Sequence, residues 1–137
     1  MGEWVRTGST DLANIYFRNQ PQNSTLYLGI YIVDVAPADF ESIDFTGIHE
    51  PIASAYARIP LVPSNWIVYG GVATYPEVEF EVTLEALGTI YGCFIATTGP
   101  KTVDNAGVIL AMHQFPSAAI LQYYGDRLGI TPRMTIT

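Results

Sequence analysis

Three glutamates at a spacing of two, Glu77, Glu79 and Glu81, could in principle bind a hard cation or relay protons. They alternate with apolar residues in the stretch PEVEFEV, and this alternation predicts a strand whose successive side chains point to opposite faces. The glutamates would then lie about 7 Å apart along one solvent face. Calcium needs six to eight oxygens that converge on one point, and a single row on a strand cannot supply them. We therefore predict a solvated strand face and no metal site.

Two further groups of polar residues are of types that could carry out chemistry. Asp39, Glu41 and Asp44 resemble part of a calcium-binding loop, but the later glycine and the distal glutamate are out of register, which favours a polar loop. Neither His49 nor His113 lies beside a residue that would serve as a nucleophile. The sequence has no nucleophile elbow, glycine-rich phosphate loop or HExxH motif. We expect no catalytic residue, no metal and no cofactor, and hence no enzyme.

The single cysteine, Cys93, excludes an internal disulfide bond and forms no zinc-binding pattern. Its neighbours in GTIYGCFIATT are apolar, so we predict a small buried hydrophobic residue rather than a reactive thiol.

The composition indicates one soluble domain with an excess of apolar surface. The 137 residues are 49% hydrophobic and only 14% charged, against roughly 25% charged residues in typical domains, which predicts contacts in an oligomer or assembly. A net charge of −7 argues against nucleic acid or anionic lipid as a partner. No signal sequence and no run of about 20 apolar residues is present, so we expect no membrane span and synthesis in the cytoplasm.

Most of the chain has the pattern of short strands. A short helix is expected over 9–19, and Pro132 predicts an edge or bulged final strand. Gly125-Asp126 is typical of a tight hairpin between the last two strands. Strands are predicted over 25–35, 54–61, 66–69, 77–84, 89–97, 107–115, 118–124 and 127–136. About eight strands at this spacing indicate an all-β, single-domain β-sandwich, jelly-roll-like, with one short N-terminal helix.

Two N-terminal features distinguish residues 1–52 from the body expected at 53–137. The strand at 25–35 is apolar at nearly every position, so we expect it to be covered on both faces, by a loop, the helix or a neighbouring subunit. The connection at 36–52 is long for a compact domain. It carries four large apolar residues, Phe40, Ile43, Phe45 and Ile48. Burying each of them fully is worth about 1.5–3 kcal/mol, so they must pack against a partner or fold back over their own sheet.

From Ala55 onward a series of landmarks occurs in a characteristic order. They are Tyr56-Ala57-Arg58, Trp66, the segment 74–80, GTIYGCFIA at 88–96, GVILAMHQF at 107–115 and an ending that starts with Gly125-Asp126-Arg127-Leu128. This order resembles a family of small virion proteins of tailed bacteriophages, described as capsid decoration, cement or tail-fibre-like proteins. Two positions depart from the family pattern: Leu87 replaces a tryptophan, and Ala96-Thr97 replaces an aspartate.

The resemblance implies a non-catalytic cement or decoration protein on the capsid surface of a virion. It implies a β-sandwich, commonly a homotrimer, that binds the major capsid protein and stabilises the shell. The alternatives are a tail-fibre or spike component, or a carbohydrate-binding module, that recognises a host glycan through exposed aromatic residues.

We expect the N-terminal segment to supply many of the contacts to the coat protein or to neighbouring copies. Arg58, in the stretch SAYARIP, is expected to point outward or between subunits; the alternative is a half-buried position with an acidic partner. The candidate interface residues are Phe40, Ile43, Phe45, Ile48, Arg58, Tyr123 and Tyr124.

Overall fold

The computed structural model describes residues 3–4, 6–19, 21, 25–35, 48–99 and 108–135. In these ranges the chain forms one α-helix and ten strands that pair in antiparallel sheets, which confirms the expected all-β class. The elements are β1 (Glu3–Trp4), α1 (Arg6–Phe17), β2 (Leu26–Tyr31), β3 (Ile59–Leu61), β4 (Ile67–Tyr69), β5 (Val72–Thr74), β6 (Val78–Glu81), β7 (Gly88–Ala96), β8 (Ile109–Leu121), β9 (Arg127–Ile130) and β10 (Arg133–Thr135), with a short 3-10 helix at Pro63–Asn65.

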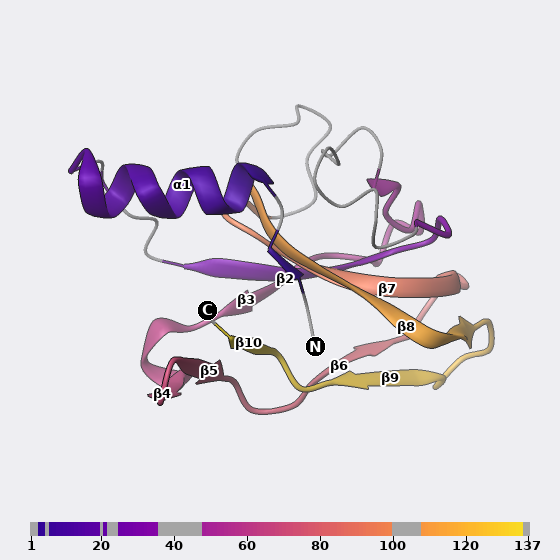
Figure 1. The fold of residues 1–137 in the computed structure, drawn as a ribbon. Helices are drawn as coiled ribbons and strands as arrows, with labels where there is room; N and C mark the ends of the chain where they lie inside the picture. Colours follow the sequence, from indigo (N-terminus) through magenta and orange to yellow (C-terminus); the bar gives the residue numbers. More distant parts are fainter. Residues whose placement is uncertain are drawn as a thin grey trace.

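The strands form two layers, and the helix lies on top of them. A five-stranded sheet in the order β1-β8-β7-β2-β3 faces two smaller sheets, β10-β5-β4 and β6-β9 (Figure 1). The main core fills the space between these layers, and α1 covers the other face of the large sheet (Figure 1). Because β1 and β2 belong to the five-stranded sheet, the sandwich includes N-terminal residues as well as the body expected from 53 onward.

Strand β2 is buried on both faces, as its apolar pattern predicted. Leu28 and Ile30 point into the main core. On the opposite face Tyr31 belongs to a second apolar cluster, and Gly29 lies so close to the ring of Phe94 that an added Cβ atom would overlap it. Both covers come from the chain itself, since the main core lies against one face and the second cluster against the other. The double burial therefore needs no neighbouring subunit.

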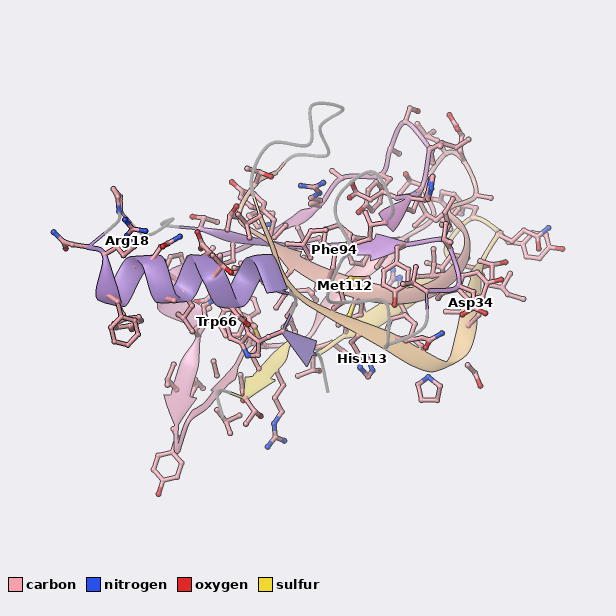
Figure 2. All side chains as sticks on the ribbon, turned by 45° about the horizontal axis from the view of Figure 1, so that its top comes forward. Arg18, Asp34, Trp66, Phe94, Met112 and His113 are labelled. Atoms are coloured by element: carbon pink, nitrogen blue, oxygen red, sulfur yellow. The ribbon has the colours of Figure 1, made fainter. Side chains whose placement is uncertain are left out.

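Ile48 is buried in the second cluster. This residue is 1% exposed, so its expected role as an interface residue is wrong for the folded chain. Phe94 and Met112, both labelled in Figure 2, belong to the same cluster. The other candidates in the connection, Phe40, Ile43 and Phe45, lie outside the described residues, as do Asp39, Glu41 and Asp44.

In place of the two strands expected over 107–115 and 118–124, the structure has one long strand, β8, which spans Ile109–Leu121. Its pairing with β7 is interrupted between Gly92, which pairs with Gln114, and Ile90, which pairs with Ala119. Pro116 falls inside this irregularity. Because proline has no N–H to donate to the ladder, a bulge lets the strand continue past it.

The turn at Gly125-Asp126 does not close a hairpin between β8 and β9. Instead it carries the chain from the large sheet to the small sheet, where β9 pairs with β6. The turn is held against the end of β6 because the N–H of Gly125 donates to the carbonyl of Val82 and the N–H of Val82 donates to the carbonyl of Asp126. Pro132 then separates β9 from β10, which forms the edge next to β5.

The bounds of the helix and of the strand expected over 54–61 also differ from the predicted ones. The helix begins at Arg6, one turn earlier than expected, and its buried Gly8 lies against the backbone of Leu110 in β8. The strand predicted over 54–61 is reduced to β3. The residues before β3 form a turn instead, in which the N–H of Tyr56 donates to the carbonyl of Ala53.

Candidate functional site

The glutamate row is a solvated strand face, as predicted. Glu79 and Glu81 are exposed, whereas Phe80 between them is buried in the main core. Arg127 of β9 lies across from them, with its guanidinium 3.7 Å from the carboxylate of Glu79 and 3.6 Å from that of Glu81. The position of Arg127 beside the glutamates could not be predicted from the pattern of one strand, because it depends on the pairing of β6 with β9.

The two histidines occupy unrelated environments. His49 is exposed and has a left-handed backbone conformation, with φ of 43°. His113, labelled in Figure 2, lies on β8 and packs its ring edge-on against Phe115, with 5.9 Å between ring centroids. Within the described ranges, no three His, Cys, Asp or Glu side chains come close enough to hold a metal ion.

A cleft of about 460 Å³ lies between the two layers and is open to solvent. Its wall is formed by β7 and β8 on one side and by residues 129–134 on the other; the lining residues are Leu28, Cys93, Phe94, Ile95, Ala111, Met112, His113, Phe115, Gly129, Ile130, Thr131, Pro132, Arg133 and Met134. Burial raises the pKa of the Cys93 thiol to about 12, so the thiol stays protonated at neutral pH. This agrees with the predicted structural role of Cys93.

Arg58 does not point outward, which corrects the expected interface role. It is 4% exposed, and its Nε and Nη2 atoms donate to the two carboxylate oxygens of Glu50 at 2.9 and 2.8 Å. Its Nη1 donates to the carbonyl of Thr98, and the guanidinium lies 5.4 Å from the ring centroid of Phe94. The structure therefore has the other arrangement that the sequence left open, an acidic partner. A buried guanidinium needs such a partner because an unpaired buried charge is very costly.

Tyr56 completes this network. Its hydroxyl donates to the Glu50 carboxylate at 2.7 Å and accepts a hydrogen bond from the backbone N–H of Ile30 at 3.2 Å. Burial, with a further contribution from the Glu50 charge, raises the pKa of Tyr56 far above its usual value. The hydroxyl therefore remains a donor, and the network holds the segment before β3 against the large sheet.

One group of exposed apolar side chains lies on strand β4. Ile67, Val68 and Tyr69 are 69%, 72% and 87% exposed, and we call these three residues the hairpin patch. The root of the β4–β5 hairpin is well packed, because Trp66 before β4 lies edge-on against Tyr75 after β5, with ring centroids 5.1 Å apart. A firmly anchored hairpin thus carries an uncovered apolar strand.

A second group of exposed apolar residues surrounds the turn between β8 and β9. We call Leu84, Ile120, Tyr123 and Tyr124 the turn patch; all four are exposed. Asp126 holds the turn in shape, since its carboxylate accepts the backbone N–H groups of Gln122 at 3.0 Å and Tyr123 at 2.8 Å. The sequence marked Tyr123 and Tyr124 as candidate interface residues, and their exposure leaves them available for that role.

The two patches lie at opposite ends of the molecule. The β4–β5 hairpin is at the left end of Figure 1, and the β8–β9 turn is at the right end; Figure 2 gives the same arrangement. The C-terminal end of α1, with exposed Tyr16 and Phe17, also lies at the hairpin end. The hairpin patch could not be predicted from the sequence, because a strand of three apolar residues has the pattern of a core strand.

No helix in the described part of the chain is both long and apolar enough to cross a membrane. Comparison of the chain with protein-family models, curated proteins and solved structures finds no match.

Proposed function

We propose that the protein is a non-catalytic decoration or cement protein, which bridges coat-protein subunits on the outside of a bacteriophage capsid. The observation that carries this proposal is the pair of apolar patches at opposite ends of one small domain. Large exposed apolar patches on a folded domain commonly mark contact surfaces. A protein that only bound one partner would need one such surface, whereas a bridging protein needs two.

The mechanism is mechanical. Each patch would bury apolar surface against a different coat subunit, at about 25 cal/mol per Å² removed from water. The body between the patches has a continuous core and a buried ion-pair network, so it would transmit load from one contact to the other without bending. Repetition over a closed shell would then oppose the outward pressure of the packaged genome.

The composition of the patches supports protein contacts over glycan recognition. Tyr69, Tyr123 and Tyr124 could stack on sugar rings, but each patch also presents aliphatic side chains, Ile67 and Val68 in one and Ile120 and Leu84 in the other. Aliphatic groups offer no hydrogen bonds to sugar hydroxyls, whereas they fill apolar pockets on proteins well. A tail-fibre or glycan-binding role is therefore the weaker proposal.

The homotrimer expected from the family resemblance stays a proposal, which rests on the resemblance and on the low content of charged residues. The doubly apolar strand that also suggested it is covered within the chain, by the main core on one face and the second cluster on the other. Light scattering on the isolated protein would measure its molar mass directly.

Virion stoichiometry tests the proposed function. Particles purified from the virus that encodes the chain should contain it in a copy number comparable to that of the coat protein, as measured from gel band intensities. A few copies per particle would indicate a fibre component, and absence from the particle would refute a virion role.

Patch variants would test the bridging mechanism. Tyr123→Ser and Tyr124→Ser together, at the turn patch, should weaken binding to capsids that lack the protein. Ile52→Ser is the matched control, because Ile52 is 89% exposed but belongs to neither patch. Equal binding by the double variant and the control would argue against the turn patch as a contact.

A further inference from the structure

Strand β4 is an edge strand without the features that protect the other edges. Sheet edges are commonly blunted by charge or proline, because their unpaired backbone groups invite another strand. In this molecule β3 contains Pro60, β10 begins with Arg133, β6 carries Glu79 and Glu81, and β9 begins with Arg127. β1 has only two residues. β4 has neither a charge nor a proline, and the whole segment 62–76 around it contains no charged residue.

The hairpin geometry shows which backbone groups face the free edge. A two-glycine turn at 70–71, with φ of 57° and 76°, joins the strands, and the first pair beside it is Tyr69 with Val72. Such primed two-residue turns place a hydrogen-bonded pair next to the turn. Because pairs alternate along an antiparallel ladder, the next residue, Val68, directs its N–H and C=O away from β5. These groups point to the free edge of the sheet.

The side chains of β4 are exposed to solvent, like the backbone groups at its free edge. Ile67 and Tyr69 share one face of the strand and Val68 lies on the other, since successive residues alternate. All three are mostly exposed. The root of the hairpin is held by the Trp66–Tyr75 ring contact and by the hydroxyl of Tyr75, which accepts the N–H of Val62 at 2.9 Å. The edge is therefore preorganised, and little conformational entropy would be lost when a strand adds to it.

We propose that β4 accepts an extended segment of the coat protein, which adds to the β10-β5-β4 sheet as a fourth strand. This inference rests on the proposed decoration function. The incoming segment would bond to the free N–H and C=O of Val68 and place apolar, β-branched or aromatic residues opposite Ile67 and Tyr69. It would be uncharged at the contact, because a charge there would be desolvated against a neutral surface.

The size of the edge favours the coat protein over a second copy of this chain. Self-pairing through β4 would use three residues from each copy. A stable interface between free proteins uses roughly 20–30 residues on each side, so such a dimer would be weak. On a capsid the turn patch would hold the molecule in place at the same time, and the second contact would benefit from a high effective concentration.

Binding of edge variants to capsids tests the inference. Val68→Pro removes the outward N–H without removing a bond to β5, and Val68→Lys keeps the N–H but places a charge beside the edge. Capsids prepared from a virus with the gene deleted are the probe, and co-sedimentation gives the dissociation constant. We expect both variants to bind at least tenfold more weakly than wild type, and Ile52→Ser to bind like wild type. Far-ultraviolet circular dichroism checks folding; if Val68→Pro does not fold, Val68→Lys decides.

The outcomes separate this inference from the proposed function. Capsid binding by wild type, with unchanged binding by a folded Val68 variant, would overturn strand addition and leave the decoration role standing. Lack of binding by wild type would overturn both. A wild-type oligomer in light scattering that the Val68 variants dissociate would show that a second copy occupies the edge, and this also overturns the inference.

Discussion

The guanidinium of Arg58 and the carboxylate of Glu50 form a two-bond ion pair whose side chains are 1% and 6% exposed. The pair joins the segment before β3 to the large sheet, through the carbonyl of Thr98 on one side and the hydroxyl of Tyr56 on the other. Each charge is tolerated in the interior only because the other is present.

Arg58→Ala should therefore destabilise the protein strongly. Removal of one partner leaves the Glu50 carboxylate buried and uncompensated, which typically costs about 3–5 kcal/mol of unfolding free energy. Urea denaturation would measure the loss. Arg127→Ala is the matched control, because the ion pairs of Arg127 are exposed and worth about 0–1 kcal/mol. Equal losses in the two variants would mean that the Arg58–Glu50 pair contributes little to stability.

Gly8→Ala should destabilise the protein, although a change from glycine to alanine in a helix usually stabilises it. Alanine in a helix interior is normally about 1 kcal/mol better than glycine. Here the added Cβ atom would overlap the backbone carbonyl of Leu110, so α1 would have to move away from β8. We expect a loss of about 1–3 kcal/mol, as for other overpacked sites, measured by thermal denaturation. Ser9→Ala, at an exposed position of the same helix, should leave stability unchanged or slightly higher. Stabilisation by Gly8→Ala would show that the helix does not pack this closely.

Acid should loosen the turn between β8 and β9. The backbone N–H groups of Tyr123 and Gln122 bind the Asp126 carboxylate and lower its pKa in the folded state. A depressed folded pKa means that this stabilisation is present above the unfolded-state pKa of about 3.9 and is lost as the pH falls through the lower folded value. Asp126→Asn should be mild, because the amide oxygen still accepts a hydrogen bond.

Stability measured between pH 6 and pH 2 would test this pH dependence. Asp126→Ala should remove part of the acid-dependent loss seen in the wild type. An identical pH dependence in wild type and Asp126→Ala would argue against the carboxylate as the cause.

A chelator should leave the melting temperature unchanged. Glu79 and Glu81 are exposed and face Arg127, and their row on one strand does not converge on a point. A large fall in melting temperature with EDTA, restored by added calcium, would instead reveal a metal site.

Much of the local structure could be predicted from the residues alone. Alternation around Phe80 identified the buried and exposed faces of β6, and the apolar run at 25–35 identified a strand covered on both faces. The apolar neighbours of Cys93 indicated its burial. The first two inferences depend on a property of a single strand, namely that successive side chains point to opposite faces, and the third depends on the immediate neighbours of one residue.

Only the tertiary structure decided which segments meet. No pattern near Arg58 identifies Glu50 as its partner, and nothing in the ending of the chain shows that β9 pairs with β6 while β10 pairs with β5. In the same way, the apolar residues of β4 have the sequence pattern of a core strand, and only the tertiary structure shows that they lie exposed at a sheet edge. The physical reason is that alternation follows from the local geometry of one strand, whereas pairing depends on the combined free energy of contacts between segments far apart in the sequence.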